Sequence, residues 1–138
     1  MNTGSTTLGY ARSAHFAGHH RVYSRMKKSH PEYIALIGGK REGPWACYSS
    51  EGLAQETVRH AKFMYDHYDQ PSVSLWPADG FKKCECESCG SKTPSEVVWE
   101  FVDRVAAELY TTHPDRLVVC GAYTPYVDPP SSIERLTP

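Results

Sequence analysis

Four cysteines with the spacing of metal ligands are the residues of this sequence most able to do chemistry. Cys84, Cys86 and Cys89 form a Cys-x-Cys-x-x-Cys cluster, and Cys47 lies just before a predicted helix. Four thiolates suit a tetrahedral zinc ion, with zinc–sulfur bonds of about 2.3 Å. No histidine closely follows the cluster, so we expect a closed, structural zinc site. The alternatives are disulfides, for example from Cys47 to one of the three, and free thiols.

Two amphipathic helices are predicted to position these cysteines. One helix, about residues 94–112, starts with a capping box formed by Thr93 and Glu96. The other, about residues 51–68, follows two serines, either of which can cap it. The apolar stripes are Val97, Val98, Phe101, Val102, Val105 and Leu109 in the first helix, and Ala54, Val58, Ala61, Tyr65 and Tyr68 in the second.

A short apolar strand is predicted after each helix, at residues 72–76 and 117–120. The order helix, strand, helix, strand over residues 51–123 is typical of a parallel sheet. The long loop of residues 77–93, which holds the cysteine cluster, follows a strand. Functional loops of parallel α/β folds lie at the carboxyl ends of strands. We therefore expect this loop on the active face.

The fold class predicted is α/β, either a small open domain or a partial (β/α)8 TIM-barrel-like segment with parallel strands. The 138 residues fall short of the roughly 250 of a complete barrel. We take residues 1–138 as a single domain or domain fragment. Residues 1–50 are expected to be irregular, with a small hairpin at residues 32–41 that turns at two glycines. Residues 124–138 are expected to form a tail, and Cys120 to be plain core.

The charge balance limits the partners. Fifteen Lys and Arg against 16 Asp and Glu give a formal charge of -1, which argues against a nucleic-acid partner. No apolar run approaches the roughly 20 residues that span a bilayer, so no membrane partner is expected. No signal peptide is visible at the start, although a longer parent protein could be exported. The location therefore stays open.

Several segments resemble one family of bacterial proteins. Residues 72–80, followed by the cysteine cluster at 84–89, are similar to the family's "SVSLSPNDG…CECxxC" signature. The chain resembles the domain of unknown function 4838 family over roughly residues 18–130. Further likenesses cover residues 30–36, 39–41, 46–49, 101–106, 113–117 and 122–123, and those in the helices are weaker.

This resemblance implies a TIM-barrel fold grouped with glycoside hydrolases, with a distant likeness to alpha-glucuronidases and hexosaminidases. The expected substrate is then a complex carbohydrate, cleaved at its glycosidic bonds. Asp79 directly follows a predicted strand and would act as acid, base or substrate-orienting group. Glycosidases use two carboxyl groups about 5 to 9.5 Å apart, and the second is not identified here. The alternative is that Asp79 only caps its loop. The chain departs from the family pattern in keeping only Gly80 after this aspartate.

Three further residues are candidates for contact with a sugar. His19 could hydrogen-bond a hydroxyl group. Trp76, at a strand end, could stack on a sugar ring, and Tyr123 would face the same mouth as Asp79. The structural alternatives are a surface histidine, a core tryptophan and a packed tyrosine with its hydroxyl at the rim.

Three functions remain open at this level. The first is a glycoside hydrolase-like domain, and the second is a non-catalytic carbohydrate-binding or structural remnant of such a barrel. The third is a small zinc-binding interaction module. An incomplete barrel exposes apolar strand edges, so homo-oligomerisation or poor solubility is expected if these 138 residues are the whole product.

Overall fold

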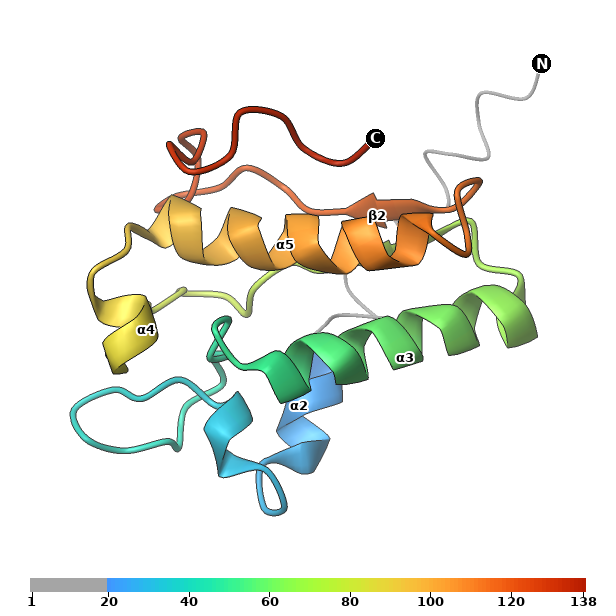
Figure 1. The fold of residues 1–138 in the computed structure, drawn as a ribbon. Coiled ribbons are helices and arrows are strands. Elements are labelled where there is room, and N and C mark those ends of the chain that lie inside the picture. The colour runs from blue at the N-terminus through green and yellow to red at the C-terminus, as the bar shows by residue number, and fades with distance from the viewer. Residues whose placement is uncertain (1–19) are drawn as a thin grey trace.

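The two long predicted helices are present and lie side by side (Figure 1). The computed structural model describes residues 20–138. Helix α3 spans Glu51–Tyr68 and helix α5 spans Pro94–Tyr110, so each bound lies within two residues of its prediction. The predicted sugar contact His19 lies outside the described residues. Capping and periodicity therefore predicted the main helical frame correctly.

The helix starts follow from their capping residues. At α5, the Glu96 backbone N–H donates to the Thr93 hydroxyl at 3.2 Å, and the Thr93 N–H donates to the Glu96 carboxylate at 2.8 Å. This reciprocal pair is the predicted capping box. At α3, the Ser50 hydroxyl accepts from the Leu53 N–H at 3.3 Å. Asp69 caps the other end of the helix, directly after Tyr68, and its backbone is left-handed with φ of 47°.

The apolar stripes of the two helices face one another and form the core. All six predicted positions of α5 are buried. Four of the five predicted positions of α3 are buried as well. The exception is Tyr68, which is 60% exposed because it is the last residue of the helix and lies beyond its packed part. Its assignment to the core was wrong.

Two short parallel strands lie against these helices. Strand β1 spans Ser72–Ser74 and strand β2 spans Leu117–Val119, paired from Ser72 with Leu117 to Ser74 with Val119. The pair is joined through α5, which gives one βαβ unit. The α/β class with parallel strands is thereby confirmed. Among the described residues the sheet has two strands and is open, so the barrel remains a prediction.

The segment before α3 is less regular. Helix α2 spans His20–Met26, and a 3-10 turn, η1, spans Pro31–Tyr33. The predicted hairpin is confirmed at its turn, where Ile37 and Lys40 form an antiparallel bridge around two glycines with positive φ. Its start is helical rather than extended, since proline at the first position of η1 favours a helical turn.

The carboxyl-terminal segment, residues 124–138, packs along α5 rather than leaving the domain. The Trp99 indole N–H donates to the carbonyl of Tyr126 at 3.1 Å. The Ser131 hydroxyl donates to Glu96 at 2.8 Å.

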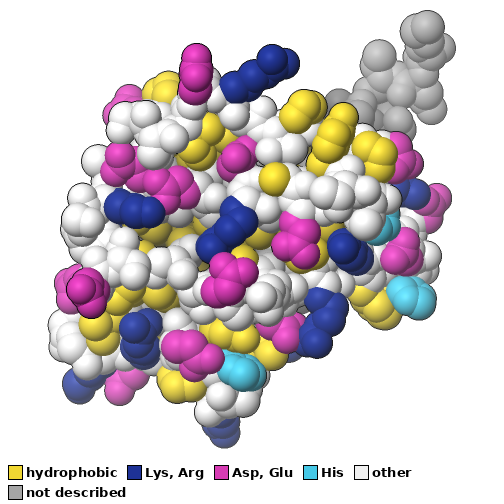
Figure 2. Space-filling view, in the orientation of Figure 1, with side chains coloured by type: hydrophobic (Ala, Val, Ile, Leu, Met, Phe, Trp, Pro, Cys, Tyr) yellow, Lys and Arg dark blue, Asp and Glu magenta, His cyan; other side chains and the backbone are white. Residues whose placement is uncertain are grey.

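The surface carries mixed charge. Figure 2 shows basic and acidic side chains interspersed over the face of the molecule that is turned to the viewer, in keeping with the near-zero net charge. None of the described helices is both long and apolar enough to span a membrane.

Candidate metal centre

Cys47 is held by a buried segment that leads into α3. Its backbone N–H donates to the carbonyl of Tyr33 at 2.8 Å, and the neighbouring Ala46 bridges to Ile34. The Ser50 N–H donates back to the carbonyl of Cys47 at 3.0 Å, which forms a tight turn before the helix. The Cys47 side chain is buried and its position is fixed from both sides.

The other three thiols come from the loop after β1. Cys84 lies outside regular secondary structure, Cys86 is the N-cap of the short helix α4, Glu87–Gly90, and Cys89 lies within that helix. The N–H groups of Cys89 and Gly90 donate to the carbonyl of Cys86 at 3.1 and 2.7 Å. The Lys83 ammonium group donates to the carbonyls of Cys89 and Gly90 at 3.0 and 2.8 Å. These contacts close the loop around the thiols, and the short spacing of the cluster requires such a turn.

The four sulfur atoms converge. The Sγ atoms of Cys47, Cys84, Cys86 and Cys89 all lie within 4.8 Å of one another. The Cys47 and Cys86 sulfurs are 3.7 Å apart. Four sulfurs at about 2.3 Å from one tetrahedral ion would be about 3.8 Å apart. A disulfide would need about 2.05 Å, and all five cysteines are free thiols. The prediction that these four cysteines lie close enough to share one metal ion is confirmed.

The thiols perturb one another as one coupled group. The pKa of Cys47 is lowered, chiefly because the Cys84 and Cys89 thiols hydrogen-bond its sulfur. The pKa of Cys89 is raised, first because its thiol donates a hydrogen bond to the Cys47 sulfur and so keeps its proton. The Leu36 backbone N–H also donates to the Cys84 sulfur at 3.2 Å. The lowered pKa of Cys47 favours its thiolate, which is the form that binds a metal.

A cation lies beside the cluster. Burial works against the charge of the half-buried Arg41, but a hydrogen bond with Cys47 and the nearby Cys84 and Cys86 raise the pKa of this guanidinium. Arg41 also donates to the carbonyl of Ile34. A positive charge here offsets part of the negative charge that four thiolates and one divalent ion would carry.

Enclosure of the site matches the structural class of metal centre. Three of the four cysteines are buried, and Cys86 is half-buried. The Ser49 hydroxyl closes the remaining side, 3.3 Å from the Cys47 sulfur and 3.5 Å from the Cys86 sulfur. Cys120 is separate: it follows β2, is half-buried, and burial raises its pKa to about 12. The donor set is therefore four sulfurs with no open position, as in structural zinc sites.

The predicted carbohydrate residues are not brought together with the cysteines. Asp79 is exposed in the turn after β1, next to Gly80, whose φ of 63° favours glycine. Its carbonyl, rather than its carboxylate, accepts from the Trp45 indole at 3.2 Å. Trp76 is half-buried, packed on Gly121, while Tyr123 is 71% exposed. These placements leave the predicted roles of the three residues open.

Two residues of the site were missed by sequence reasoning. Ser49 follows Cys47 by two positions, a spacing that could have suggested a contact with the same group. Arg41 carried no such signal, because its approach to the thiols depends on how the hairpin folds back on the loop. The hairpin is held against the loop by the hydrogen bond from the Glu85 N–H to the carbonyl of Leu36, at 2.8 Å.

The chain matches a family model over nearly its whole length. The family described as a domain of unknown function (DUF4838) matches residues 1–136. No curated protein and no solved structure matched the chain. The family description states no activity, so the site geometry must carry the functional argument.

Proposed function

The chain belongs to the DUF4838 family, and from that premise we propose that it is a zinc-stabilised domain whose four-cysteine site fixes the loop after β1. The ligands are Cys47, Cys84, Cys86 and Cys89. The observation that carries this proposal is the convergence of their four sulfurs within 4.8 Å. Zinc bound there would supply cross-linking between distant segments rather than a reactive water, because no ligand position is left open.

The choice of metal rests on the donor set. Four thiolates in a tetrahedral arrangement suit zinc or a single iron, and disfavour magnesium and calcium, which prefer oxygen. An iron–sulfur cluster contains several metal atoms, so its ligand sulfurs stand further apart than the ligands of one ion. The 3.7 Å separation of the Cys47 and Cys86 sulfurs favours one ion. We propose zinc over iron because four cysteines are a common ligand set of structural zinc sites.

The residues around the ligands form a support for the loop. The Gly38 N–H donates to the Glu85 carboxylate at 2.7 Å. The Glu85 N–H donates to the carbonyl of Leu36, and Lys83 binds the end of α4. The hairpin, the loop and the start of α3 therefore meet at the four sulfurs. The loop of residues 77–93 is long and contains little regular structure. A metal cross-link would order it by joining it to the segment before α3.

Metal analysis of matched variants tests the proposal. We expect about one zinc per chain in protein purified without chelator, as for a site with a single set of four ligands. Cys84→Ser should lose most of this zinc, whereas Cys120→Ser, which changes a cysteine outside the cluster, should keep it. The proposal is contradicted if both variants retain equal zinc, or if the unmodified chain carries no metal and presents all its thiols as reactive.

Hydrolysis of a carbohydrate is a second proposed function, favoured by the place of Asp79 in the loop that follows the carboxyl end of the parallel strand β1. The exposed Tyr123 follows the neighbouring strand. A panel of polysaccharides and aryl glycosides should reveal turnover that Asp79→Asn abolishes. Sugar binding without turnover would support the non-catalytic alternative, and the absence of both would exclude carbohydrate as the ligand.

A further inference from the structure

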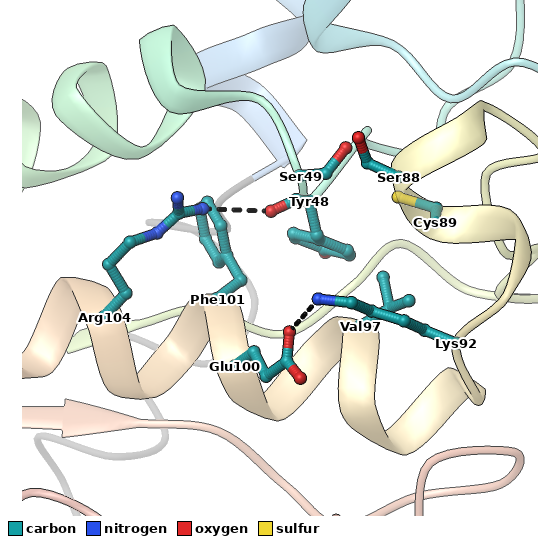
Figure 3. A pocket seen from close by; sticks show the side chains of 9 residues that line it. All are labelled: Tyr48, Ser49, Ser88, Cys89, Lys92, Val97, Glu100, Phe101 and Arg104. Atoms are coloured by element: carbon teal, nitrogen blue, oxygen red, sulfur yellow. Dashed lines mark hydrogen bonds and ion pairs between the residues drawn. The ribbon is translucent and has the colours of Figure 1, made fainter. Parts of the chain in front are cut away.

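A second site lies beside the metal centre, in a pocket of about 340 Å³ between the start of α3, α4 and α5 (Figure 3). Cys89 and Ser49 form the wall that it shares with the cysteine cluster. Tyr48 and Phe101 form an aromatic floor, with ring centroids 4.8 Å apart. Both rings are buried, so the floor is rigid. The pocket is open to solvent on its polar side, where the charged side chains lie.

Two cations reach into this pocket from the α5 side. Figure 3 shows Lys92 extending to Glu100 and Arg104 extending to the carbonyl of Tyr48, while the Ser49 and Ser88 hydroxyls point toward one another on the opposite side of the pocket. Lys92 forms an ion pair with Glu100, which is the one carboxylate in the lining. Arg104 pairs with Glu51 at 2.9 Å, but Glu51 is 68% exposed, so solvent screens that pair. The lining thus carries two positive charges and one negative charge.

Two strong hydrogen-bond donors line the pocket, Arg104 and Lys92. The Arg104 Nη2 atom donates to the carbonyl of Tyr48 at 3.1 Å. The Arg104 Nε atom is buried and donates to no group in the described part of the chain. The Lys92 ammonium group has three donors, one of which binds Glu100, and the Ser88 hydroxyl can both donate and accept. The Arg104 side chain is 39% exposed and the Lys92 side chain 42% exposed, so their outer nitrogen atoms, rather than the buried Nε, are the donors that an incoming oxygen can reach.

We infer that this pocket binds the oxyanion group, a carboxylate or a phosphate, of a small ligand. Arg104 and Lys92 supply the charge, Ser88 supplies a neutral donor, and the aromatic floor lies beside an apolar part of the ligand. This inference goes beyond the proposed zinc site and does not require it. The shared wall of Cys89 and Ser49 means only that the pocket keeps its shape best when the cysteine cluster is ordered.

Calorimetric titration of the full chain with inorganic phosphate and with acetate tests the inference. We expect saturable binding of at least one probe, and which probe binds tells phosphate from carboxylate recognition. Arg104→Gln and Lys92→Met should each weaken binding by about 10-fold or more, as expected for loss of a charge-assisted hydrogen bond. Zinc content and circular dichroism are measured on every sample, so that loss of metal or of fold is distinguished from loss of binding.

A matched control uses Arg59, which pairs with Glu56 on the exposed face of α3. Arg59→Gln removes the same charge far from the pocket lining and should leave binding unchanged. If Arg104→Gln fails to fold, Lys92→Met decides the test. The inference is overturned if neither probe binds saturably, or if the pocket variants bind as well as the Arg59 variant.

Discussion

Arg41 is the residue whose role follows most directly from electrostatics. Four thiolates around one divalent ion carry a net charge of two negative units, and a half-buried group of that charge needs a nearby cation. Arg41 is hydrogen-bonded to Cys47 and feels the charges of Cys84 and Cys86. It therefore favours the deprotonated, metal-binding form of the thiols without contacting the ion.

Replacing Arg41 should weaken metal binding without removing a ligand. Arg41→Gln is expected to lower zinc affinity by about 10- to 100-fold, the usual effect of losing a residue that supports metal ligands. Competition with a chromophoric chelator measures this change. Lys40→Gln serves as the control, because Lys40 is an exposed cation one position away. Equal affinity in the Arg41 and Lys40 variants would contradict the role given to Arg41.

Gly121 has a separate role, since it leaves room for Trp76. A Cβ atom at this position would lie 2.4 Å from the indole ring. Gly121→Ala should therefore displace the ring and destabilise the fold by about 1–3 kcal/mol, with a change in tryptophan fluorescence. At Gly90 the nearest atom to an added Cβ is 3.9 Å away, so Gly90→Ala should be tolerated. Unfolding in urea compares the two variants.

At the scale of elements, the helix caps were the most predictable features. Thr93, Glu96 and the apolar repeat define α5 from local chemistry alone, and Ser50 does the same for α3. Strand β1 was placed correctly but is shorter than predicted, because pairing with β2 ends at Ser74. Helix α4 was missed because its four residues carry no periodic signal. The meeting of Cys47 with the other thiols was predicted from its place before a helix, whereas Arg41 required the tertiary fold.

The capping box gives α5 a defined pH dependence. The pKa of Glu96 is lowered, first by the hydrogen bond from the Thr93 backbone and then by that from Ser131. A carboxyl group with a lower pKa in the folded state stabilises the fold above its unfolded pKa of about 4.3, and this contribution is lost as pH falls through the folded pKa.

Glu96→Gln tests this dependence, since glutamine can keep the box but does not titrate. The variant should be less stable than the unmodified chain at neutral pH, and the difference should shrink toward about pH 3. Urea unfolding of both proteins over that range measures it, and any acid effect on the cysteine cluster is common to both. A difference that stays constant with pH would contradict the role given to Glu96.

At the scale of the whole molecule, the described fold has a small sheet and two long helices, and much of the remaining chain lies in loops. The hairpin, the loop of residues 77–93 and the start of α3 are joined at the four sulfurs. Structural zinc contributes about 10–16 kcal/mol in small zinc-binding peptides. That contribution is as large as the whole unfolding free energy of an ordinary domain, about 5–15 kcal/mol.

Metal removal should therefore loosen the molecule as a whole. Chelation is expected to lower the melting temperature strongly and to expose residues 77–93 to limited proteolysis, with recovery when zinc is restored. Helix α5 has its own caps and core contacts, so part of the helical circular dichroism should survive. Unchanged melting and protease resistance after complete metal removal would show that the cysteines are not a structural metal site.

X-ray absorption at the zinc edge of the purified protein tests the central claim most directly. We predict four sulfur neighbours at about 2.3 Å and no nitrogen or oxygen neighbour. Cys84→Ser should change that shell, while Cys120→Ser should not. A shell that includes nitrogen or oxygen in the unmodified chain, or the absence of bound zinc, would contradict a closed centre of four cysteines.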